Sequence, residues 1–156
     1  MHETTRSRIR RIFLSPRPTF ALVTAAGLLG MTFEELMREI GSGAIVAVST
    51  RLGQRVGREE MIAAATRTWE QAAIEEALGE DAAAVLPEAI RLVELRARVP
   101  RYQRDMLWYL AQRDGTSVDQ VLTRELEDVA CAHSEELAVG VPGFALALAW
   151  PESGPN

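Results

Sequence analysis

The sequence contains no lysine, a single cysteine and only two histidines among its 156 residues. One cysteine excludes an intramolecular disulfide, which fits a reducing cytoplasm. The two histidines, His2 and His133, are far apart and lie at no spacing typical of zinc ligands, so we expect no metal site. Cys131 and His133 fall in a helical pattern, and we expect a small buried side chain at Cys131 and a partly buried one at His133.

Long apolar runs and enzyme motifs are also missing. The longest apolar run, Phe20 to Leu29, is too short to span a bilayer, and no apolar stretch follows the N-terminal arginines as in a secretory signal. No nucleophile elbow occurs. Gly41-Ser-Gly43 follows a predicted helix and precedes a strand, the reverse order of a dinucleotide-binding loop, so it predicts a helix end. We expect a cytoplasmic protein that is not an enzyme, with no cofactor and no membrane contact.

The net charge of −5 hides an uneven distribution. Residues 1–68 carry ten arginines and six carboxylates, and residues 91–105 carry five arginines and two carboxylates. The stretches 69–90 and 106–156 are acidic. Two arginine-rich islands alternating with acidic segments are compatible with a nucleic-acid partner, since local charge matters more than its sum.

Two short helices joined by a tight turn are predicted in the first island. Small residues at Ala25 and Ala26 belong to the first helix, which breaks at Gly30. The second helix restarts at Thr32, which forms a T-x-x-E capping box with Glu35. Two helices with this turn are the frame of a helix-turn-helix.

A small hairpin is predicted after these helices. Apolar residues at Ile45 and Val48 lead into a turn at Leu52-Gly53, and the chain returns through Val56. The order of turn, helix end and hairpin over residues 19–65 resembles the MerR and excisionase group of winged helix-turn-helix domains. That resemblance implies DNA binding, with the hairpin as the wing. The alternative is a pair of core helices with a hairpin and no DNA contact.

The second island begins with a strand-like alternation. Val93, Leu95, Ala97 and Val99 alternate with Glu94, Arg96 and Arg98, a period of two that predicts a strand. A helical pattern starts at Arg101 and stops at Asp114-Gly115, and Ser117 caps a further helix with Gln120 at the capping-box position. The alternatives are an edge strand that pairs with the hairpin, or a continuous helix from Pro87.

The order of strand, helix, turn and helix over residues 92–130 resembles the ribbon-helix-helix family of the Arc and MetJ repressors. The resemblance implies that the strand pairs with its copy from a second chain and enters the major groove with Glu94, Arg96 and Arg98 toward the bases. It also implies that the backbone amides of Thr116, Ser117 and Val118 hold a phosphate. A homodimer is expected independently, because a lone strand leaves its backbone groups unpaired.

We therefore expect a mainly α fold with short β, in which a winged helix-turn-helix is joined to a ribbon-helix-helix dimerisation element. The expected segments are a basic N-terminal arm (1–18, flexible or unstructured), a winged helix-turn-helix domain (19–66), a helical connector (67–91), a ribbon-helix-helix element (92–131) and a C-terminal helical segment and tail (132–156). The expected DNA-binding residues are Arg96, Arg98, Glu94, Thr116, Ser117, Arg38, Arg51, Arg55 and Arg58.

The predicted function is that of a sequence-specific transcriptional regulator that binds double-stranded DNA as a homodimer. The alternative is an antitoxin or adaptor whose acidic region from Asp119 to Trp150 binds a basic protein partner, with one element on DNA. One feature opposes base reading by the second helix of the winged element. Glu34 and Glu35 lie at its start, where they repel phosphates, and Arg38 is its one basic residue.

Overall fold

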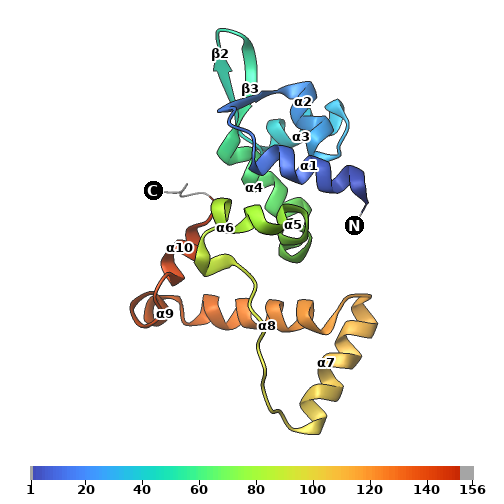
Figure 1. Ribbon diagram of the computed structural model, residues 1–156, viewed down its shortest axis with the longest axis vertical. Helices are drawn as coiled ribbons and strands as arrows, with labels where there is room; N and C mark the ends of the chain where they lie inside the picture. The colour runs from blue at the N-terminus through green and yellow to red at the C-terminus, as the bar shows by residue number, and fades with distance from the viewer. Residues whose placement is uncertain (1, 152–156) are drawn as a thin grey trace. The chain divides into compact units, whose positions relative to one another are not determined.

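The computed structural model describes residues 2–151 and is mainly helical, with a small three-stranded antiparallel sheet (Figure 1). The expected fold class, mainly α with short β, is confirmed at this level. The chain divides into two compact units. Unit 1 comprises the residues up to Leu92 with the segment from Leu146 onward, and unit 2 comprises Val93–Ala145. Within residues 2–151, none of the helices has the length and apolar character needed to cross a membrane.

The N-terminal segment is a helix, α1 (Glu3–Phe13), and belongs to the core of unit 1. Its apolar residues Ile9, Ile12 and Phe13 lie three and four positions apart, so they share one face, and all three are fully buried. α1 contacts three further helices of this unit: α2 (Leu22–Leu29), α4 (Arg58–Thr68) and α5 (Gln71–Leu78). The expected flexible arm over residues 1–18 is therefore wrong, because burial of three large apolar side chains fixes the segment.

The predicted turn between two helices is confirmed. Gly30 ends α2 with a left-handed backbone (φ 78°), and its N–H donates to the Ala26 carbonyl. Thr32 then caps α3 (Phe33–Ser42). Its hydroxyl accepts from the Glu35 N–H at 3.2 Å, and the Glu35 carboxylate accepts from the Thr32 N–H at 2.7 Å. This reciprocal pair is the capping box that the sequence predicts.

The sheet consists of β1 (Thr19–Ala21), β2 (Ala47–Thr50) and β3 (Gly53–Gly57) in the order β1–β3–β2. The predicted hairpin is confirmed as β2–β3, which projects from the helices of unit 1 in Figure 1. β1 was not predicted. Its residue Phe20 pairs with Val56 of β3, and the burial of both side chains attaches the sheet to the core.

The connector between the two islands packs on α1. The helix α5 buries Ile74, Ala77 and Leu78, and it is followed by the short segments η1 (Gly79–Asp81), α6 (Ala82–Val85) and η2 (Glu88–Ile90). The Arg10 guanidinium donates to the carbonyls of Ala77 (3.3 Å) and Leu78 (2.9 Å) and pairs with Asp81 at 2.6 Å. The last carbonyls of a helix have no donor within that helix, and Arg10 supplies donors to two of them at the end of α5.

Unit 2 is an open pair of helices (Figure 1). The helices α7 (Arg101–Asp114) and α8 (Val118–Ala132) begin and end close to the predicted positions, and α9 (Ser134–Gly140) follows. Gly115 has a left-handed backbone (φ 65°) between them, and Ser117 and Gln120 form the predicted capping box. The last helix is α10 (Phe144–Ala149). The expected C-terminal helical segment and tail (132–156) is described up to residue 151, and residues 152–156 lie outside the described part.

Three expectations for the second half of the chain are corrected. The segment 93–99 has no regular secondary structure, so the expected strand is not formed in the single chain. It does not pair with the hairpin either, and helix α7 begins only at Arg101, so both alternative structures for this segment are wrong. Cys131 and His133 are exposed rather than buried, because within residues 93–145 the helices of unit 2 leave the end of α8 uncovered.

Candidate nucleic-acid interface

The exposed side of α3 is apolar and acidic. Phe33 and Met37 remain 47% and 37% exposed, and Glu34 and Arg38 are exposed as well. Leu36 is the fully buried residue that attaches the helix to the core. A helix that contacts a DNA groove gains from basic and polar side chains, and among the exposed side chains of α3 Arg38 alone is basic.

Glu35 is explained by capping. The Thr32 backbone N–H and, next, its hydroxyl donate to the Glu35 carboxylate and hold the pKa of this side chain below its usual value. Both carboxylates of the first turn also lie near the positive end of the helix dipole. Glu34 makes no cap, so its exposed negative charge remains the feature that opposes DNA contact by α3.

The arginines of the hairpin differ in availability. Arg51 is exposed at the turn, beside Leu52, which is 81% exposed. Arg55 lies across the sheet, where its Nε donates to Thr19 Oγ1 at 2.8 Å and its Nη2 to the Thr19 carbonyl at 3.2 Å. Arg55 therefore links β3 to β1 in addition to any outward role.

Arg58 is a structural residue. Its Nη2 donates to the Phe13 carbonyl at 2.7 Å, its backbone N–H donates to the Pro18 carbonyl at 2.9 Å, and its Nε is buried. These bonds fasten both ends of the loop between α1 and β1. The expectation that Arg58 contacts DNA is therefore not supported by its position, and of the four arginines predicted in this half only Arg38 and Arg51 are exposed.

The predicted base-reading residues of unit 2 are fully accessible. All residues from 92 to 100 are exposed. Arg96 forms a two-pronged pair with Glu94, with distances of 3.0 Å from Nε to Oε1 and 3.1 Å from Nη2 to Oε2. In an extended chain, residues two positions apart lie on the same face, which brings Glu94 and Arg96 together. Arg98 is exposed on the same alternation.

The predicted phosphate contacts at the start of α8 are engaged within the chain. The Thr116 N–H donates to the Ala111 carbonyl at 2.9 Å, and the Ser117 N–H donates to Gln120 Oε1 at 3.0 Å. The Thr116 hydroxyl also bonds to Gln120 Oε1. These two amides would have to exchange a partner to bind phosphate.

The turn before α8 is held by Asp114. The side chain of Arg113 and then that of Arg124 donate to this carboxylate, and the first of these bonds is the main reason why the pKa of Asp114 lies below its usual value. The same bond raises the pKa of Arg113. The turn that joins α7 to α8 is therefore fixed by charge pairs at its surface.

Most apolar side chains of unit 2 are uncovered. Across residues 93–145, all of which the structure describes, the buried apolar side chains are Ala111 and Val121. The large apolar residues of α7 and α8 that remain about half or more exposed are Tyr102, Met106, Trp108, Tyr109, Leu126 and Val129. An isolated helix pair with this surface has no core of its own, so the face needs a partner.

The arginines of α1 are functional candidates that the sequence-based site list omitted. The expected arm leaves them in a flexible segment, whereas the structure places them on a packed helix, where Arg6 and Arg11 are exposed and Arg10 is bonded to the end of α5. The spacing of Ile9, Ile12 and Phe13 was the signal that could have revealed this, because it predicts a one-faced helix.

No protein-family model, no curated protein and no solved structure matches this chain. Within residues 2–151 there is also no cluster of three or more histidine, cysteine, aspartate or glutamate side chains placed to hold a metal ion.

Proposed function

We propose that this chain is a sequence-specific, cytoplasmic DNA-binding regulator that acts as a homodimer. In this proposal unit 1 is a winged helix-turn-helix and unit 2 is a ribbon-helix-helix element. Support for unit 1 comes from the element order α1–β1–α2–α3–β2–β3 and the sheet order β1–β3–β2, which set two turn-linked helices beside a projecting hairpin. That is the arrangement expected of a winged helix-turn-helix.

The observation that carries the proposal is the state of unit 2. An exposed segment with alternating apolar and polar residues precedes two helices whose apolar faces are open. A second copy resolves both deficits at once. Antiparallel pairing of the two segments from Val93 to Val99 satisfies their backbone groups, and the resulting ribbon and four helices cover one another's apolar residues.

The paired segment would present Glu94, Arg96 and Arg98 on one face. Arginine matches the two acceptors of guanine, and a carboxylate accepts from cytosine. The pair between Glu94 and Arg96 has to open first, but an exposed ion pair of this kind contributes only about 0–1 kcal/mol. One arginine–guanine contact gives roughly 1–3 kcal/mol of discrimination, so base contact prevails.

The dimer is tested by Ala97→Pro, with Ala97→Val as the matched control. Proline removes the N–H that the ribbon needs, whereas valine keeps it and favours a strand. The wild-type chain and the control should sediment as dimers at micromolar concentration, and the proline variant as a monomer. A wild-type chain that is monomeric and melts cooperatively would contradict the assignment of unit 2.

Sequence reading is tested by Arg96→Ala and Arg98→Ala, with Arg104→Ala as a control that also removes one exposed arginine of unit 2. Bound sites are first selected from genomic DNA, and affinity is then measured on the selected site and on single-base variants. Each of the two variants should lose roughly 1–3 kcal/mol and relax the preference for one base. If both keep the wild-type affinity and preference, the segment from Val93 to Val99 does not read DNA.

A second candidate is an antitoxin or adaptor, and one observation favours it. The helices α8 and α9 expose carboxylates beside exposed apolar side chains, which suits a basic protein partner. The exposed carboxylates are Asp119, Glu125, Glu127, Asp128, Glu135 and Glu136. Stoichiometric co-purification with the product of an adjoining gene for a small basic protein would favour this candidate.

A further inference from the structure

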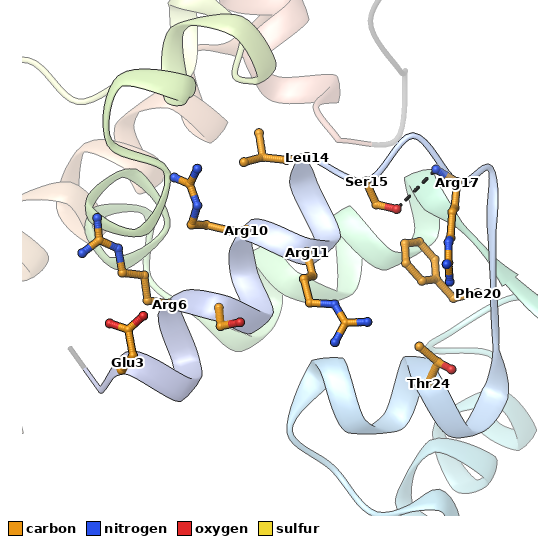
Figure 2. Close-up of a pocket in the computed structure, with 10 residues that line it drawn as sticks. Glu3, Arg6, Arg10, Arg11, Leu14, Ser15, Arg17, Phe20 and Thr24 are labelled. Carbon is orange, nitrogen blue, oxygen red and sulfur yellow. Dashed lines mark hydrogen bonds between the residues drawn. The ribbon is translucent and has the colours of Figure 1, made fainter.

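An open groove lined by arginines runs between α1 and α2 (Figure 2). Its first part, with a volume of about 700 Å³, lies between α1, the loop that follows it and the start of α2. A second part continues along both helices, and Ser7, Arg11 and Thr24 line both parts. The two parts therefore form one continuous surface of unit 1, which we call the α1–α2 groove.

The guanidinium groups in this groove are not equivalent. Arg10 is directed away and is neutralised by Asp81. Figure 2 shows that Arg11 and Arg17 extend instead toward the space beside Thr24. Both side chains are exposed, and neither forms an ion pair with a carboxylate within residues 2–151. Glu3 is the one carboxylate among the lining residues.

The positive charge of the first island, residues 1–68, is concentrated at this place. Residues 1–18 carry five arginines and one carboxylate, whereas residues 19–68 carry five arginines and five carboxylates. The positive excess of the first island therefore belongs entirely to α1 and the loop after it. The helix-turn-helix and hairpin together are neutral, and the exposed side of α3 includes Glu34. If unit 1 attracts a polyanion, the α1–α2 groove is the surface that does so.

The α2 side of the groove is open to close approach. Gly27 lies inside the helix, where glycine is unfavourable, yet a Cβ at this position would meet nothing within 4 Å. Packing within the chain therefore gives no reason for glycine here, whereas a ligand that approaches the helix backbone does. Thr24 adds a hydroxyl in the first turn of α2, which has no side-chain cap.

We propose that the α1–α2 groove binds phosphate groups of the DNA backbone, with Arg11 and Arg17 as the principal contacts and Thr24 as a further donor. The proposal rests on the proposed function and assigns the phosphate contacts of unit 1 to α1 rather than to α3. Guanidinium groups bind phosphate with two parallel hydrogen bonds. The contacts are independent of base sequence, so they position the duplex while unit 2 reads it.

The test compares the full chain with the double variant Arg11→Ala/Arg17→Ala on a random-sequence duplex of about 30 base pairs at several salt concentrations. The control, Arg67→Ala/Arg104→Ala, removes the same charge from exposed positions outside the groove. Each phosphate contact releases counterions, which raises the affinity for DNA about tenfold near 0.1 M salt. It also adds about 0.9 to the magnitude of the slope of log K against log salt concentration. The groove variant should lose affinity and slope by these amounts per contact, and the control should lose little of either.

Three outcomes separate the possibilities. Duplex binding that survives in the groove variant as well as in the control overturns the groove assignment and leaves the proposed function intact. Absence of any duplex binding by the wild-type chain overturns the proposed function and this inference with it. In the third outcome, inorganic pyrophosphate or an acidic peptide saturates the groove while duplex binding stays unchanged. That result would show that the groove binds another anion, and it would overturn the assignment to DNA. Circular dichroism of each variant confirms that it is folded.

Discussion

The clearest test of α1 as a core helix is the substitution Phe13→Ala. The Phe13 side chain is fully buried between α1 and the rest of unit 1. Removing a buried phenyl ring costs about 3–5 kcal/mol, from lost apolar burial and the cavity left behind. For a unit of this size each kcal/mol lowers Tm by about 4–8 °C, so the transition of unit 1 should fall by at least about 12 °C. A flexible arm would give no change.

The matched control is Arg11→Ala, on the outer side of the same helix. Its side chain is exposed, so its removal should change stability by no more than about 0.5 kcal/mol. Scanning calorimetry gives the Tm of unit 1 in each variant, and far-UV circular dichroism reports whether α1 remains helical. Equal transitions for Phe13→Ala and Arg11→Ala would refute the reasoning, since they would mean that α1 does not stabilise the unit.

Three further predictions concern helix ends and surfaces of unit 1. Gly27→Ala should raise the free energy of unfolding by about 0.5–1 kcal/mol in urea titrations, because alanine has a higher helix propensity than glycine and its Cβ meets no atom within 4 Å. A loss of stability would show that the space beside Gly27 is occupied. Glu35→Gln should keep the capping bonds but remove a pH dependence of stability. The folded-state pKa of Glu35 is lowered, so the stabilisation by its charge is present above the ordinary value of 4.5 and is lost as the pH falls through the folded-state pKa. Acid titrations that coincide for wild type and variant would contradict this. Glu34→Gln should tighten duplex binding most at low salt, where repulsion is least screened, and an unchanged affinity would show that α3 does not face the duplex.

Local signals in the sequence predicted the centre of unit 1. The capping box of Thr32 and Glu35 and the glycine at the end of α2 depend on residues a few positions apart, so their pattern is visible in the sequence. β1 was not predicted because its three residues form a strand only through pairing with β3, more than thirty positions away. Short strands held by distant partners leave no periodic signal.

Charge obscured the pattern of α1. The five arginines of residues 1–18 suggested a solvated arm, although Ile9, Ile12 and Phe13 have the spacing of a buried helix face. For the candidate site, the sequence predicts some side-chain exposures but not the hydrogen-bond partners. The exposure of Arg96 and Arg98 follows from an alternation that the sequence displays, whereas the inward bonds of Arg58 depend on the Phe13 and Pro18 carbonyls, whose approach the sequence does not reveal.

The unformed strand from Val93 to Val99 connects the fold to the proposed mechanism. In the single chain the segment is irregular. In the proposed dimer a second copy would supply the partner that its backbone groups need. A dimer would then carry two α1–α2 grooves and one shared ribbon. Groove arginines would change the salt dependence of binding and leave base preference alone, and ribbon arginines would change base preference with a smaller effect on the salt slope. Because the two sets belong to separate units and share no contact partner, a variant that combines them should show the sum of the two free-energy losses, within about 0.5 kcal/mol.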